Sequence, residues 1–192
     1  GLPRIYYTIP DQDLLWITQS IRLFKGLGPS YADHPGAYWP ISLLLKINIF
    51  SITKFFNIID QNGVGNVDMI ERLISLSRIE NCLISGGIPI VLYFLLKELN
   101  IHKLLVISSA YILGLSSALL NGVSQIRHEN ISVLMMLIFI LLSNRLLINN
   151  EQKTISIFKS TLNLFIFFIS IYSKQQILLL LPIIAIFFLY VI

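Results

Sequence analysis

The sequence predicts an all-α protein, a multi-pass transmembrane helical bundle, and three observations support this prediction. First, 55% of the 192 residues are hydrophobic and only 12% are charged. Second, the mean hydropathy of +0.77 is far from that of soluble globular domains. Third, apolar stretches close to the roughly 20 residues that cross a bilayer recur along the second half of the chain.

Five segments have the length and composition of spanning helices: residues 80–98, 104–121, 131–148, 155–172 and 176–192. The connections between them are short, so consecutive helices are expected to run in opposite directions and to pack as neighbours. Most Lys and Arg residues near these loops lie on one side, which the positive-inside rule makes cytoplasmic. That side has Lys97, Lys103, Arg145, Lys153 and Lys159, and the other has Arg127 and Lys174.

Residues 1–79 are expected to form a long extracytoplasmic loop with juxtamembrane helices, followed by the transmembrane helices of residues 80–192. The first segment contains most of the acidic residues and both tryptophans. Because the chain begins without Met and stops within an apolar run, we expect it to be truncated at both ends.

Two interfacial helices are predicted within this loop. Leu14, Ile17, Ile21 and Phe24 recur at helical spacing, opposite Gln19, Ser20, Arg22 and Lys25, which indicates an amphipathic helix. Tyr38 and Trp39, with the run 41–56, indicate a second, more apolar helix. Lys46 and Ser51 interrupt that run, which favours an interfacial over a spanning position.

The charge argues against nucleic-acid binding, and the cysteine content excludes sites that need two or more cysteines. The net charge of +4 comes from 14 basic and 10 acidic residues spread thinly along the chain, so nucleic acid is not an expected partner. Cys82 is the single cysteine, which excludes an internal disulfide and a cysteine metal cluster.

Four polar clusters, all expected on the extracytoplasmic face, are candidates to carry chemistry. Each also has a structural explanation: helix capping for the first acids, a Pro-Gly turn, an interfacial salt bridge with a helix cap, and a snorkelling lysine. The sequence leaves these explanations open beside the functional one, in which ionisable groups near the membrane bind substrate. The clusters contain Asp11 and Asp13; Asp33 and His34; Arg127, His128 and Glu129; and Lys174.

A partial calcium-loop pattern also occurs between Asp60 and Glu71. Asn62, Gly65 and Asp68 fit its spacing, but Val64 stands where an oxygen ligand is required, and only one such loop is present. A plain extracytoplasmic turn is therefore the preferred interpretation.

Taken in order, these clusters resemble the GT-C superfamily of membrane glycosyltransferases, especially the protein O-mannosyltransferase and lipid A aminoarabinose transferase branch. Asp11-Gln12-Asp13 stands where that family has an Asp-Glu motif, followed by an amphipathic helix ending in Gly26. Asp33-His34-Pro35-Gly36 looks like the family's Asp-x-His-Pro-Pro turn. Arg78 with Gly86 and Gly87, the cluster 127–130, and Ser173-Lys174 are similar to its later motifs. Two departures, Gln12 in the acidic pair and Gly36 in the turn, leave the catalytic acid and the substrate open.

The resemblance implies an inverting transfer of a sugar from a polyprenyl-phosphate-linked donor to an extracytoplasmic lipid, glycan or protein acceptor. Asp13 or Asp11 would be the general base, with Asp13 fitting the family's spacing better. Asp33, His34 and the cluster 127–129 would bind substrate. Arg127, Lys174 or a divalent metal ion would offset charge on the leaving phosphate. The expected location is the bacterial inner or plasma membrane.

Two other classes of function remain alternatives: a multi-pass transporter and a non-catalytic membrane assembly subunit. A transporter would place its polar groups near the bilayer midplane on broken helices. Here the predicted helices are apolar through their centres, and Gly86, Gly87 and Pro89 are the sole obvious interruption. An assembly subunit would give the acid-rich first segment no purpose.

Overall fold

The computed structural model describes residues 12–28, 38–52, 67–117, 119–120, 126–148, 157–173 and 182. Within these ranges the regular elements are all helices, joined by short turns, and no strand occurs. The helices are α1 (Gln12–Phe24), α2 (Tyr38–Ile52), α3 (Val67–Glu98), α4 (Lys103–Gly114), α6 (His128–Ile148) and α7 (Ile157–Ser173).

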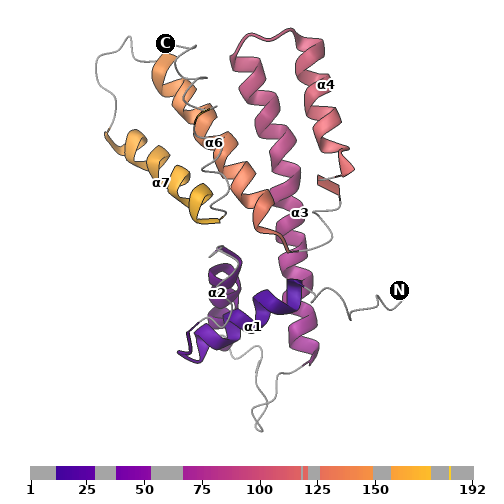
Figure 1. Cartoon of the computed structure of the whole chain (residues 1–192), viewed down its shortest axis with the longest axis vertical. Coiled ribbons are helices and arrows are strands. Elements are labelled where there is room, and N and C mark those ends of the chain that lie inside the picture. Colours follow the sequence, from indigo (N-terminus) through magenta and orange to yellow (C-terminus); the bar gives the residue numbers. More distant parts are fainter. Residues whose placement is uncertain are drawn as a thin grey trace.

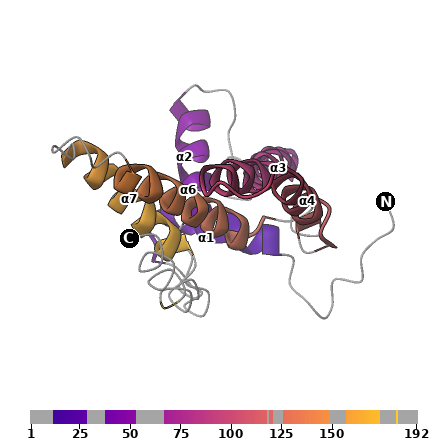
Figure 2. The same cartoon turned by 90° about the horizontal axis from the view of Figure 1, so that it is seen from above.

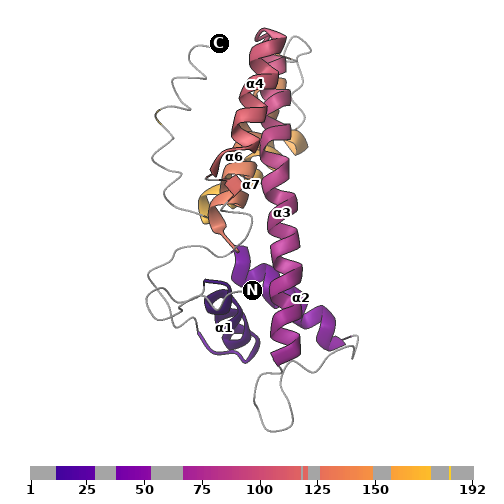
Figure 3. The same cartoon turned by 90° about the vertical axis from the view of Figure 1, so that its right-hand side faces the viewer.

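Helix α3 is the longest helix and the centre of the arrangement (Figure 1). Seen from above, α7, α6 and the pair α3 and α4 form a row in which each helix packs on its neighbour (Figure 2). Helices α1 and α2 pack on each other and on the N-terminal half of α3 (Figure 3). The chain therefore has an apolar row of helices above and a two-helix platform below.

Two helices in the described ranges are long and apolar enough to cross a membrane: Val67–Glu98 and His128–Leu146. This is fewer than the five spans predicted. Helix α4 has only 12 residues, α7 has 17, and the last expected span, residues 176–192, lies outside the described part except for Pro182. The predicted boundary at residue 79 falls inside α3, because that helix begins at Val67 and continues without interruption.

Helix α1 forms where it was predicted, and residues of both its apolar and its polar face are buried. Ile17 is buried as expected, whereas Leu14 and Phe24 are 47% and 38% exposed. Gln19 and Ser20, assigned to the polar face, are buried instead. Both faces of α1 therefore contribute buried side chains, and the polar contacts that hold the buried polar face are described below.

Two helices end in a left-handed residue that closes the last turn. After α1, Gly26 has φ +71°, its N–H bonds to the carbonyl of Leu23 at 3.0 Å, and the N–H of Leu27 bonds to Arg22 at 2.9 Å. Asn100, with φ +56°, has the same role after α3. These are Schellman-type caps, and they confirm the predicted end of the amphipathic helix at Gly26.

The core lies where the platform meets α3 and α6. Trp39, Leu43 and Ile47 of α2 are fully buried there together with residues of the other helices: Trp16, Ile17, Met69, Leu73, Ile84, Ile126 and Ile131. In contrast, the outer faces of α4 and α7 expose many large apolar side chains. Such a surface is costly in water and suits a lipid environment.

Candidate functional site

Asp13 is the most tightly held of the predicted site residues. Its side chain has no exposed surface, and both carboxylate oxygens accept hydrogen bonds. Oδ2 accepts from Arg78 Nε at 2.8 Å and pairs with Arg78 Nη2 at 2.6 Å. Oδ1 accepts the backbone N–H of Ile126 at 2.7 Å. These charge-assisted bonds offset the cost of removing the carboxylate from water.

This contact joins three distant parts of the chain. Asp13 lies in the first turn of α1, Arg78 lies on α3, and Ile126 lies two residues before the start of α6. Asp13 is therefore held beside the start of α6, a helix that is long enough to cross a membrane.

The predicted cluster 127–129 lies at this junction. The His128 ring meets the Trp16 ring edge-on, with 4.3 Å between centroids and 86° between planes. His128 is 7% exposed, and Arg127 and Glu129 are half-buried. Asp13 and this cluster therefore lie close together where α1, α3 and the start of α6 meet.

Four predicted site residues lie outside the described residues: Asp11, Asp33, His34 and Lys174. Most of the partial calcium loop, residues 60–66, does so too, while Asp68 and Glu71 are exposed residues of α3. No group of three or more metal-ligating side chains occurs in the described ranges.

A second polar cluster, which sequence reasoning missed, ties α2 to α3. Glu80 forms an ion pair with Lys46 and accepts hydrogen bonds from Tyr38 at 2.6 Å and from Ser42 at 3.1 Å. Lys46 also donates to Ser77 at 3.2 Å and lies 5.5 Å from the centroid of the Trp39 ring. The signal available in the sequence was Lys46 within an apolar run.

The hydroxyl of Tyr38 donates a hydrogen bond in this cluster and keeps its proton. Burial raises the pKa of its hydroxyl above the ordinary value, and the hydrogen bond to Glu80 and the negative charge of Glu80 raise it further. The ionised form would be desolvated and would face a carboxylate. Tyr38 therefore keeps its proton at physiological pH.

Polar pairs also join the helices of the row. Asn130 of α6 donates to Asn81 at 3.3 Å and to Ser85 at 2.7 Å, both on α3. Ser132 of α6 and Ser170 of α7 each donate to the other's backbone carbonyl, at 2.6 and 2.9 Å. Such mutual pairs satisfy polar groups that lipid could not.

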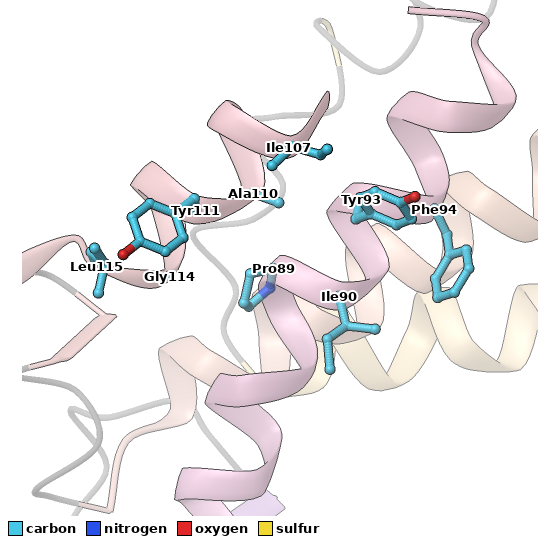
Figure 4. Close-up of a pocket in the computed structure, with 9 residues that line it drawn as sticks. All are labelled: Pro89, Ile90, Tyr93, Phe94, Ile107, Ala110, Tyr111, Gly114 and Leu115. Carbon is cyan, nitrogen blue, oxygen red and sulfur yellow. The ribbon is translucent and has the colours of Figure 1, made fainter. Parts of the chain in front are cut away.

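Two apolar grooves are open on the surface. The α3–α4 groove, of about 620 Å³, lies beside Pro89 and is lined by the aromatic side chains of Tyr93, Phe94 and Tyr111 together with aliphatic ones (Figure 4). The α2–α7 groove, of about 490 Å³, is lined by α2, α7 and Met135 of α6. Tyr38 and Ser42 of the second polar cluster lie at its edge.

Comparisons with protein families, with curated proteins and with solved structures find no match to this chain.

Proposed function

We propose that the chain is an integral membrane glycosyltransferase of the GT-C kind. It transfers a sugar, with inversion, from a polyprenyl-phosphate-linked donor to a lipid, glycan or protein acceptor. The observation that carries this proposal is the Asp13 contact with Arg78 and Ile126, which holds Asp13 beside the Arg127-His128-Glu129 cluster. Acid and base groups beside a cation at a membrane surface suit transfer from a lipid phosphate.

Within this proposal the two acids have different roles. A general base needs a lone pair that can reach the acceptor hydroxyl. Asp13 is buried and both of its oxygens are already engaged, so it holds the segment in place. Asp11, two residues earlier, is the proposed base. Arg127 and Lys174 offset the charge on the leaving phosphate, and a divalent metal ion could act with them.

Substrate contacts and membrane placement complete the proposal. Asp33, His34, His128 and Glu129 bind the sugar or the acceptor. The five predicted spans cross the bacterial inner or plasma membrane, and residues 1–79 face the extracytoplasmic side. The support is the apolar outer surface of α4 and α7 and the two helices long enough to span.

A transporter remains the second candidate because of Asn144. This residue of α6 is 1% exposed, and neither its carboxamide nitrogen nor its oxygen has a hydrogen-bond partner. A buried polar side chain without a partner in an apolar helix can mark the path of a transported substrate. A transporter would move its substrate without breaking a sugar–phosphate bond.

The test is release of polyprenyl phosphate from a radiolabelled polyprenyl-phosphate sugar by the purified chain in nanodiscs supplied with membrane acceptors. We expect Asp11→Asn to lower the rate by about 10²- to 10⁴-fold, the usual contribution of a general base. Asp68→Asn, at an exposed acid of α3, is the control and should leave the rate unchanged. Absence of release by the wild-type chain with mannosyl, aminoarabinosyl and glucosyl donors would overturn the proposal.

A further inference from the structure

The α2–α7 groove has the chemistry of a site for an amphiphile. Its walls are apolar: Ile41 and Leu45 on α2 face Phe165 and Phe168 on α7. All four side chains are exposed, by 49% to 63%. The volume of about 490 Å³ is within the usual range of ligand pockets. A hydrocarbon chain lying in the groove would cover the exposed surface of these four side chains.

A pair of opposite charges, Lys46 and Glu80, lies next to the groove, although neither residue is part of its lining. Ser42 lines the groove and is hydrogen-bonded to both members of the pair, Lys46 and Glu80. Their side chains are 21% and 27% exposed. Tyr38, also on the lining, presents a hydroxyl at the same edge.

We propose that the α2–α7 groove binds one zwitterionic phospholipid with a primary-ammonium headgroup, its acyl chain between α2 and α7 and its headgroup at Lys46 and Glu80. The lipid phosphate replaces Glu80 as the partner of Lys46, and the ammonium donates to Glu80. The two charges of such a headgroup match the two charges of the pair. This inference does not depend on the proposed transferase activity.

Charge complementarity selects among lipids. An anionic headgroup without an ammonium meets Lys46 but leaves the carboxylate of Glu80 facing a second negative charge. A quaternary choline group carries the positive charge but has no N–H to donate to Glu80. Phosphatidylethanolamine is therefore preferred over both phosphatidylglycerol and phosphatidylcholine.

The experiment is native mass spectrometry of the chain released from nanodiscs that contain equal parts of these three lipids. We expect one retained phosphatidylethanolamine per chain, preferred about tenfold over each competitor, the effect of one charge-assisted hydrogen bond. Glu80→Gln keeps an acceptor for Tyr38 and Ser42 but removes the negative charge. It should shift the preference to phosphatidylglycerol, whereas Glu71→Gln, at an exposed position of the same helix, should not.

A second variant tests the groove if Glu80→Gln fails to fold. Ile41→Trp fills the groove from an exposed position and should abolish lipid retention while the helical circular dichroism stays unchanged. Retention of all three lipids to the same extent by the wild type overturns the proposal. So does an unchanged preference in folded Glu80→Gln, or a dimer without lipid that Ile41→Trp dissociates.

Discussion

At the scale of single residues, Asp13 and Arg78 are unequal partners. The Asp13 side chain has no exposed surface, while that of Arg78 is 43% exposed. Removing the arginine therefore leaves a buried negative charge without its cation, whereas neutralising the aspartate leaves a cation that water can reach. The ion pair is weak evidence for net stability, but breaking it from one side is costly.

We predict that Arg78→Ala lowers the free energy of unfolding by about 3 kcal/mol and Asp13→Asn by only about 1 kcal/mol. The asparagine keeps an oxygen for the Ile126 N–H. Thermal unfolding in detergent, followed by circular dichroism, measures both changes, with Lys97→Ala at an exposed position as the control. The double variant Asp13→Asn with Arg78→Ala should be more stable than Arg78→Ala alone, and a less stable double variant would contradict this account.

At the scale of helices, one glycine lets α3 and α6 approach each other. A Cβ atom on Gly87 would lie 3.3 Å and 3.4 Å from the two methyl carbons of Leu134 on α6. A Cβ on the adjacent Gly86 would meet nothing within 4 Å. Both glycines lie in the interior of α3, so replacing either one changes the helix propensity in the same way. A difference in stability between the two variants therefore reports the contact with Leu134.

We predict that Gly87→Leu destabilises the fold by about 1–3 kcal/mol, the usual cost of overpacking a tight interface. Gly86→Leu should be neutral or stabilising, because it replaces glycine by a better helix former in open space. Thermal unfolding of the two variants in the same detergent gives the comparison. Equal destabilisation by both would show that the loss of glycine, and not contact with Leu134, is responsible.

The helices themselves could be predicted from local patterns, but their faces could not. Periodicity located α1, and apolar length located α6 and α7 within a few residues. The face of α1 depends on Asp13 meeting Arg78, 65 residues away, and Ile126, 113 residues away. The start of α3 at Val67 was missed because its first turns are too polar to count as a span. Contacts between such distant residues leave no periodic signal.

At the scale of the whole molecule, most polar contacts of α3 with its neighbours gather within a short stretch; the exception is the ion pair of Glu98, at the end of α3, with Arg145 of α6. Between residues 77 and 85 this helix binds α1 through Arg78, α2 through Ser77 and Glu80, and α6 through Asn81 and Ser85. The two or three turns after them face apolar neighbours. If α3 crosses a membrane, this polar stretch would lie at the membrane boundary, at the same level as the proposed site.

If α3 crosses the bilayer, its two ends must lie on opposite sides. Its 32 residues extend about 48 Å, more than the hydrocarbon core of about 30 Å. We predict that a cysteine at Lys25, on the platform, reacts with an impermeant maleimide added outside intact cells. A cysteine at His102, in the turn after α3, should react only after the membrane is opened, since the positive-inside rule makes that turn cytoplasmic.

Both variants are made in a Cys82→Ser background, because the native Cys82 is exposed and would react itself. Both Lys25 and His102 are exposed, so accessibility depends on the membrane alone. Labelling of both from outside would show that α3 does not cross, and would remove the membrane setting that the transferase proposal requires. Labelling of His102 alone would reverse the orientation and place the Asp13 site on the cytoplasmic face, where the resemblance gives it no donor.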